Sequence, residues 1–549
     1  MISRLFAKEG SSPARPLWAG RIINSALALL ALFWLSSVQA MPVDTRLELA
    51  SQEVWTLDLP LQAGDYLRGY LSSNSGIQAV IRGAGGRPVK YLAQPGAREA
   101  FIYFSPESAG PFRLEVQAEE AAARVQLQLE KVPLSVDEPV AASHPLSTRV
   151  GEARQALDAG EDPDAVWSQL VAAGTPLIET SDEVPHAQLQ TDERLVTFLW
   201  RGAQQQVLLF GGPSYEHAAL KRLGATDIWY LSYSLPVGTR MSYQLAADVP
   251  QIQGSAREQR VAILSRARQD PHNPHSWQPY LLADAYNTRS FLELEVEPPA
   301  VLQQADQSLP EVQSYQLASE LLGNQRSVQI FMPQALQAEP GSVVPLAIFF
   351  DGDDYLSQVP TPRILNNLIS AGRIPPLVAV FVSNPNRAAR TSELPCNPVF
   401  ADFMAKELLP WIGQTTGFHF QPEKTLLAGA SFGGLAAACT AFHHPENFGL
   451  VLSQSGSFWW SPEAADRPEW FNAQVAETER KPLRFYLSAG LFETDFGESG
   501  ILNANRQLAQ LLEVKGYPVI LEEFSAGHDY FHWRATLHRG LLHLLGSLQ

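Results

Sequence analysis

The alternation of apolar and polar positions sets the first part of the chain apart. Between residues 54 and 132, short segments such as 54–59 and 125–129 alternate apolar and polar side chains, and turn-forming stretches such as 83–88 separate them. A period of two residues is typical of strands that bury one face. The pattern predicts a small antiparallel β-sandwich over residues 41–135.

A second series of strands is predicted in residues 151–305. This part of the chain begins with two helical segments, 152–157 and 165–172. Strand segments follow at 195–200, 206–210, 228–232 and 241–245. This succession favours a second β-sandwich, of immunoglobulin-like kind. The Pro-, Ser- and Ala-rich stretch 136–150 is typical of a linker between the two.

From residue 306 to 549 the pattern changes to strands that alternate with helices. Segments 344–350 and 376–382 are continuous apolar runs, which is typical of parallel strands buried on both faces. Further strands are expected at 326–331, 426–428, 483–487 and 519–524. The fold class is therefore α/β: a doubly wound, mostly parallel sheet of α/β-hydrolase type, preceded by two β-sandwich domains.

The first forty residues have the pattern of an export signal. Four basic residues precede an apolar run at 22–35, and small residues at 36–40 suit a cleavage site. We expect a periplasmic protein that is not inserted in the membrane after cleavage of residues 1–40. An uncleaved membrane anchor is the alternative.

Charge and cysteine content narrow the possible partners. The 549-residue chain has 40 Lys and Arg against 57 Asp and Glu, a formal charge of −17, which argues against nucleic acid as a partner. An anionic ligand would need a local cluster of Arg. The two cysteines, Cys396 and Cys439, are either a disulfide or two buried thiols.

The strongest chemical motif is Gly429-Ala430-Ser431-Phe432-Gly433, which follows an apolar run and precedes an Ala-rich helical segment. Strand, G-x-S-x-G and helix in this order form the nucleophile elbow of α/β-hydrolases, and the glycines give room for the tight turn. Ser431 is the expected nucleophile. The N–H of Phe432 is one expected oxyanion donor.

The partners of Ser431 are expected on loops after later strands, in the order acid and then histidine. Glu493 follows the strand at 483–487, with Asp495 as the alternative acid, and His528 follows the strand at 519–524. The N–H of Asp353, after the strand at 344–350, is the expected second oxyanion donor. We expect no metal site.

The motifs together resemble the ferric enterobactin (enterochelin) esterase family, of the esterase D-like group. The matching segments are 351–353, Arg390 with 393–397, 429–434, 453–460, 489–493, 527–529 with 533–534, and, upstream, 196–201, 226–229 and 270–277. The resemblance implies hydrolysis of the ester bonds of a trilactone siderophore, with Ser431, His528 and Glu493 as catalytic residues. The first β-region more weakly resembles prepeptidase C-terminal-type domains.

The resemblance also implies a ferric catecholate siderophore as the substrate, with iron present only as part of it and no other cofactor. Such a complex is anionic and aromatic. A clamp of Arg387 and Arg390, with stacking faces from Trp459, Trp460 and Trp533, would bind it. Core packing is the alternative role of Trp459 and Trp460.

Two other functions remain open from the sequence. One is a serine esterase or acyltransferase for another ester, such as a feruloyl ester, which would share Ser431, Glu493 and His528 but not need the Arg residues. The other is a siderophore-binding protein without turnover.

Overall fold

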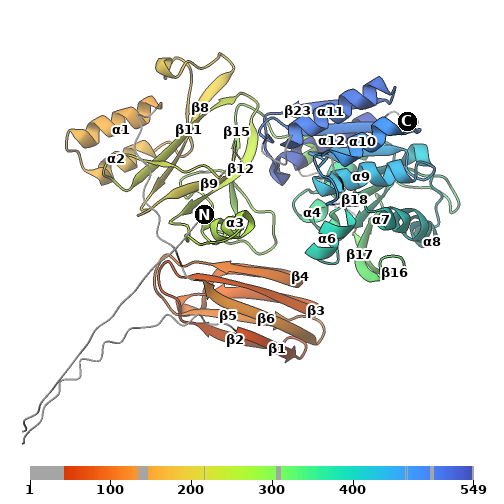
Figure 1. Cartoon of the computed structure of the whole chain (residues 1–549), viewed down its shortest axis with the longest axis horizontal. Helices are drawn as coiled ribbons and strands as arrows, with labels where there is room; N and C mark the ends of the chain where they lie inside the picture. The colour runs from red at the N-terminus through yellow and green to blue at the C-terminus, as the bar shows by residue number, and fades with distance from the viewer. Residues whose placement is uncertain are drawn as a thin grey trace, which may run out of the picture. The chain divides into compact units, whose positions relative to one another are not determined.

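The computed structural model describes residues 43–132, 134, 146–214, 217–303, 311–463, 465, 468–494 and 500–546 (Figure 1). The predicted signal peptide, most of the predicted linker and Asp495 lie outside the described residues. Within them, no helix has the length and apolar character needed to cross a membrane.

The first described region is one antiparallel sheet. Its strands are β1 Val43–Leu49, β2 Val54–Leu59, β3 Tyr66–Arg82, β4 Pro88–Phe104, β5 Phe112–Ala118 and β6 Ala123–Val132, in the order β1-β6-β3-β5-β2 with β4 on β3. The first half of β3 pairs with β6 and its second half with β5. The register between β3 and β4 shifts after Ser72. Leu71, Ile81 and Leu127, from different strands and from both halves of β3, belong to one buried core.

The second region has two antiparallel sheets around one core. Its elements are α1 Thr148–Asp158, α2 Pro163–Leu170, β7 Leu177–Glu179, β8 Glu193–Arg201, β9 Val207–Gly211, β10 Lys221–Arg222, β11 Ile228–Pro236, β12 Arg240–Ala247, α3 Ala256–Leu264, β13 Ala267–Arg268, β14 Ser276–Trp277 and β15 Arg289–Glu293. One sheet is β10-β11-β8-β7, and the other is β13-β12-β15-β14 with β9 on β12. Phe198 of β8 and Tyr243 of β12 meet edge to face, with ring centroids 4.8 Å apart.

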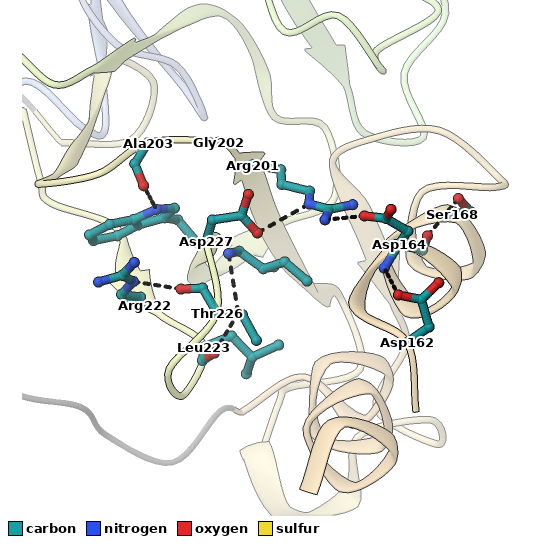
Figure 2. A network of polar contacts seen from close by, with 12 residues as sticks. Asp162, Asp164, Ser168, Arg201, Gly202, Ala203, Arg222, Leu223, Thr226 and Asp227 are labelled. Carbon is teal, nitrogen blue, oxygen red and sulfur yellow. Dashed lines mark hydrogen bonds and ion pairs between the residues drawn. The ribbon is translucent and has the colours of Figure 1, made fainter. Parts of the chain in front are cut away.

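Two of the upstream motifs hold this region together (Figure 2). The Arg201 guanidinium at the end of β8 contacts the Asp227 carboxylate, with Nε–Oδ1 3.1 Å, and the Asp164 carboxylate in the first turn of α2. The indole N–H of Trp229 donates to the Ala203 carbonyl at 3.1 Å. These residues therefore join α2 to the turns of the sheet.

The third region is built on an eight-stranded sheet. Its strands are β16 Gln313–Ser319, β17 Asn324–Phe331, β18 Leu346–Phe350, β19 Val378–Val382, β20 Thr425–Ala430, β21 Leu450–Gln454, β22 Arg484–Gly490 and β23 Val519–Phe524, in the order β16-β17-β19-β18-β20-β21-β22-β23. The six strands from β19 to β23 in that order are parallel, whereas β16 and β17 add an antiparallel edge. The pattern analysis missed β16 and β21. The apolar part of β21 is only three residues long, which is too short to identify as a strand by periodicity.

Helices cover both faces of this sheet. They are α4 Gly352–Ser357, α5 Thr361–Ser370, α6 Arg387–Glu393, α7 Pro398–Phe403, α8 Leu409–Thr416, α9 Phe432–His443, α10 Trp470–Glu477, α11 Gly500–Val514 and α12 Tyr530–Leu545. Side chains of α7, α9, α10 and α11 pack into one core, and those of α5 and α12 into a second core on the opposite face. The predicted α/β class is confirmed, because strands alternate with helices and the central strands are buried.

A disulfide joins Cys396, after α6, to Cys439 on α9. Their Cα atoms are 5.2 Å apart. Of the two alternatives for the cysteines, the structure shows the disulfide. It ties the segment that follows α6 to the helix that begins immediately after Ser431.

Candidate active site

Ser431 occupies a strained turn between β20 and α9. Its backbone has φ 57° and ψ −122°, a conformation that residues other than glycine rarely adopt. A Cβ on Gly429 would lie 2.5 Å from the backbone of Gly433, and a Cβ on Gly434 would lie 2.5 Å from Ser453 Oγ. The elbow therefore depends on glycine where α9 approaches β20 and β21.

His528 and Glu493 form the second part of the site. His528 Nδ1 lies 2.6 Å from Glu493 Oε1, and the Glu493 side chain is completely buried. The other carboxylate oxygen accepts the Gly490 N–H at 2.6 Å. When Nδ1–H is donated to Glu493, Nε2 is the ring nitrogen that can take up a proton. Trp533 packs edge to face on the His528 ring at 4.8 Å, which fixes the plane of the imidazole.

One cavity of about 470 Å³ brings the nucleophile and the histidine together. Ser431 and His528 both line it, with Arg390, Tyr530 and Trp533. The strand ends β20, β22 and β23 thus deliver Ser431, Glu493 and His528 to the same edge of the sheet, as expected for a parallel arrangement.

The expected oxyanion donors lie in the first turns of two helices. Phe432 is the first residue of α9, and Asp353 is the second residue of α4, so neither N–H has an acceptor within its own helix. Asp351, which precedes α4 with φ 51°, lies against the start of α9: its Oδ2 is 3.2 Å from the Cβ position of Gly433. The Asp353 carboxylate accepts the Ser383 hydroxyl at 2.7 Å, and burial raises the pKa of Asp353.

The two predicted arginines take different positions. Arg390 lines the cavity and makes two hydrogen bonds of 2.7 Å to the Asp351 carboxylate. Burial opposes its charge, but the Asp351 carboxylate outweighs that effect, so the pKa of Arg390 lies above its ordinary value. Arg387 is not among the residues that line this cavity; its guanidinium lies 5.3 Å from the centre of the Phe101 ring.

The predicted tryptophans are also separated. Trp533 is 3% exposed and lines the cavity, and its indole N–H donates to Ser455 Oγ at 2.9 Å. Trp459 packs on Phe432, with ring centroids 6.2 Å apart, and belongs with the core beneath α9. Trp460 lines a different cavity, next to the disulfide. For Trp459 and Trp460 the structure therefore favours the packing alternative.

The residues that line the cavity but were not expected from the sequence include Tyr103, His217, Arg260 and Arg289. Arg260 Nη1 lies 2.9 Å from His217 Nε2, and burial together with Arg260 lowers the pKa of His217 to about 4. Arg289 Nη1 lies 3.5 Å from the Asp529 carboxylate. These residues come from the first and second regions, so no spacing around the elbow could have indicated them.

The side of the cavity formed by α4 and α12 carries a buried acid. Burial, and next the charge of Asp351, raises the pKa of Asp354 to about 6. The Tyr530 hydroxyl donates to Asp354 Oδ2 at 3.0 Å. Asp354 and Tyr530 both line the cavity, so its polar lining includes a carboxyl group that gains a proton in mild acid.

Comparison with known proteins identifies the family. Residues 319–544 match the family described as "Putative esterase", and residues 195–301 match the family described as "Enterochelin esterase, N-terminal". The iron(III) enterobactin esterase of Dickeya dadantii (strain 3937) is 30% identical over 435 residues, which cover 70% of this chain and 93% of the relative. This chain belongs to the iron(III) enterobactin esterase family. It is a carboxylic ester hydrolase.

Other members of the family give the same result. The iron(III) salmochelin esterase of Escherichia coli O6:H1 is 28% identical over 398 residues, covering 68% of this chain and 92% of the relative. The crystal structure of the enterobactin esterase from Shigella flexneri in the presence of enterobactin superposes with a TM-score of 0.56 at 28% identity, covering 70% of this chain and 99% of that one. The ferric enterobactin esterase from Salmonella typhimurium gives a TM-score of 0.58 at 26% identity, with 70% and 99% covered. The predicted family is thus confirmed, and neither alternative function is favoured.

Proposed function

We propose that the chain is a serine esterase that hydrolyses the trilactone ester bonds of a catecholate siderophore, such as ferric enterobactin, and so releases iron. One observation carries this proposal. In a chain of this family, Ser431, with its strained backbone, and His528, which contacts Glu493, line the same cavity. The names of the relatives, which act on iron(III) enterobactin and iron(III) salmochelin, supply the substrate class.

The reaction follows from the geometry. Ser431 Oγ attacks an ester carbonyl of the lactone ring, and His528 takes the proton of Ser431. His528 then gives this proton to the alkoxide oxygen of the substrate's own serine, which leaves as a hydroxyl group. Buried Glu493 holds the imidazole orientation and stabilises the imidazolium. The N–H groups of Phe432 and Asp353 stabilise the oxyanion. Water then releases the acyl group from Ser431 by the same route.

Local charge fits an anionic substrate. Arg260, Arg289 and Arg390 line the cavity of a chain whose formal charge is −17. A cluster of guanidinium groups concentrates an anionic complex where the rest of the surface repels it. Arg387, Trp459 and Trp460 lie outside the cavity lining. Arg390 and Trp533 are therefore the members of the predicted clamp that we assign to substrate contact.

We further infer an α/β-hydrolase catalytic domain preceded by two β-sandwich domains, the first made from the strands of one sheet around one core. We also infer export to the periplasm after cleavage of residues 1–40, and no cofactor besides the iron of the substrate. The disulfide supports an oxidising compartment.

The test is chromatography of enterobactin, iron-loaded and iron-free, after incubation with the mature protein. Linear trimer, dimer or monomer should form with the wild type and not with Ser431→Ala. Ser168→Ala, which changes a serine on α2 far from the elbow in sequence, is the matched control and should retain full activity. An intact trilactone after incubation with both wild type and control would refute the proposal.

A further inference from the structure

The amino-terminal sheet, residues 43–132, contributes to the catalytic cavity. Tyr103 of β4 lines the cavity that Ser431 and His528 also line. Residues 43–132 lie outside both matched family segments, 195–301 and 319–544. A residue from this sheet is therefore an addition to the part of the chain that defines the family.

One face of β4 reaches the catalytic region at three successive positions. Glu99, Phe101 and Tyr103 are each two residues apart and pair without a register shift with Ser72, Tyr70 and Arg68 of β3. Side chains two residues apart on a strand point to the same face. Glu99, Phe101 and Tyr103 therefore share one face of β4.

Glu99 and Phe101 hold helix α6. Glu99 Oε1 accepts the backbone N–H of Arg387, the first residue of α6, at 2.8 Å. The Arg387 guanidinium lies over the Phe101 ring at 5.3 Å. Three residues later the same helix carries Arg390, which lines the cavity and binds Asp351. The β4 face thus docks on the element that supplies the cavity arginine.

Tyr103 is held beside the second region through Lys90 of its own strand. The Lys90 ammonium lies 4.4 Å from the centre of the Tyr103 ring and donates to the Leu264 carbonyl at 3.1 Å. Further contacts fix the sheet against residues 258–284: Arg68–Glu258 at 2.7 Å, Tyr91 N–Asp284 Oδ2 at 2.6 Å, Gln94 Nε2–Leu282 O at 2.9 Å, Arg268–Glu107 at 2.7 Å and Arg266 Nη1–Ser105 O at 3.2 Å. An aromatic ring anchored in this way presents a preorganised contact surface at low entropic cost.

We propose that the amino-terminal sheet forms a substrate-contacting wall of the catalytic cavity and that Tyr103 is its specificity-determining residue. Tyr103 contacts an aromatic group carried by the acyl part of the ester, while Ser431 and His528 act on the ester carbonyl. The identity of that group as a catechol rests on the proposed function. The role of Tyr103 in selecting a bulky aromatic acyl group does not.

Binding is measured in the Ser431→Ala background by quenching of tryptophan fluorescence with ferric enterobactin. Adding Tyr103→Ala should weaken binding about five- to tenfold, the effect expected for loss of one aromatic contact. Tyr103→Phe should bind within about twofold, since it keeps the ring. Tyr91→Ala is the matched control. Tyr91 is also a tyrosine of β4 but is not among the residues that line the cavity, and the variant keeps the backbone N–H that donates to Asp284. Equal affinity for Tyr103→Ala and Tyr91→Ala would overturn the proposal.

Kinetics with two aryl esters separates this proposal from the siderophore assignment. Tyr103→Ala should raise KM for p-nitrophenyl benzoate about fivefold and leave kcat/KM for p-nitrophenyl acetate unchanged, because only benzoate offers a second ring. If the wild type leaves enterobactin intact but Tyr103→Ala raises KM for the benzoate alone, the proposed substrate is wrong and the role of Tyr103 is supported. If Tyr103→Ala leaves KM for both esters unchanged, the proposed role of Tyr103 is wrong. Thermal unfolding of each variant, with Tyr103→Leu as a second substitution, excludes a folding defect as the cause.

Discussion

The two ends of helix α9 differ in chemistry, although each lies near a histidine that contacts a carboxylate. At its start, Ser431 shares a cavity with His528, whose Nδ1 contacts fully buried Glu493 at 2.6 Å. At its end, both ring nitrogens of His444 contact carboxylates, Asp402 at 2.8 Å and Glu446 at 2.9 Å. The Glu446 side chain is 64% exposed.

The difference shows what makes a histidine–carboxylate contact catalytic. With one carboxylate on Nδ1, Nε2 of His528 is the ring nitrogen that exchanges a proton with the nucleophile, whereas both ring nitrogens of His444 contact carboxylates. Asp402, His443 and His444 also place possible metal-ligand atoms within 4.8 Å of one another, but Lys406 contacts Asp402 at 2.9 Å and competes for the carboxylate. The complete burial of Glu493 and the cavity that Ser431 and His528 share, more than the pairing itself, distinguish the start of α9.

The largest effect should separate the two histidines. His528→Ala should lower kcat by roughly 10⁴-fold or more, because it removes the general base. His444→Ala should change kcat less than about twofold, and steady-state hydrolysis of p-nitrophenyl acetate measures both. Similar losses in the two variants would show that α9 responds as a unit, contrary to the comparison.

The carboxylates of Glu493 and Glu446 should differ nearly as much in their effect on kcat. Glu493→Gln should lower kcat by about 10³- to 10⁴-fold, because the amide no longer stabilises the imidazolium or selects its tautomer. Glu446→Gln is the matched control and should retain activity. Asp495→Asn tests the alternative acid in the same assay: a loss as large as that of Glu493→Gln would move the role of the acid to Asp495.

A smaller effect is expected from the disulfide that lies between the two ends. Reduction, or the Cys396→Ser/Cys439→Ser variant, should lower the free energy of unfolding by about 2–4 kcal/mol, because it releases a constraint on the unfolded chain. Urea denaturation with and without reductant measures this. The chain has only these two cysteines, so the double variant should be insensitive to reductant. An unchanged midpoint on reduction of the wild type would contradict the expectation.

The smallest effect is expected at Asp402 of α7, which contacts His444 at the end of α9. Hydrogen bonding from Lys406, and then from His444, lowers the pKa of Asp402. A depressed folded-state pKa stabilises the folded protein above the ordinary Asp pKa, and this contribution is lost as pH falls through the folded value. Because solvent reaches the Asp402 side chain, which is 29% exposed, and screens these contacts, Asp402→Asn should cost at most about 0.5 kcal/mol at pH 7 and less at pH 3. Urea midpoints at the two pH values give the comparison, and a larger cost at pH 3 would contradict the sign.

The sequence by itself determined the elements whose signals are local. The apolar runs predict the central strands β18 and β19, because strands buried on both faces tolerate few polar residues. The glycines at 429 and 433 single out Ser431, because only glycine allows β20 and α9 to approach so closely. The chain order after Ser431 indicates Glu493 and His528, because parallel strands end at one edge of the sheet.

The tertiary structure alone decided which other side chains reach the cavity. Arg387 and Arg390 are three residues apart on one helix, yet one lies over Phe101 of β4 and the other binds Asp351 in the cavity. Tyr103 enters the cavity lining from a strand more than 300 residues before the nucleophile. Contacts between residues so far apart leave no periodicity or spacing in the chain, because they arise only when separately folded sheets pack together.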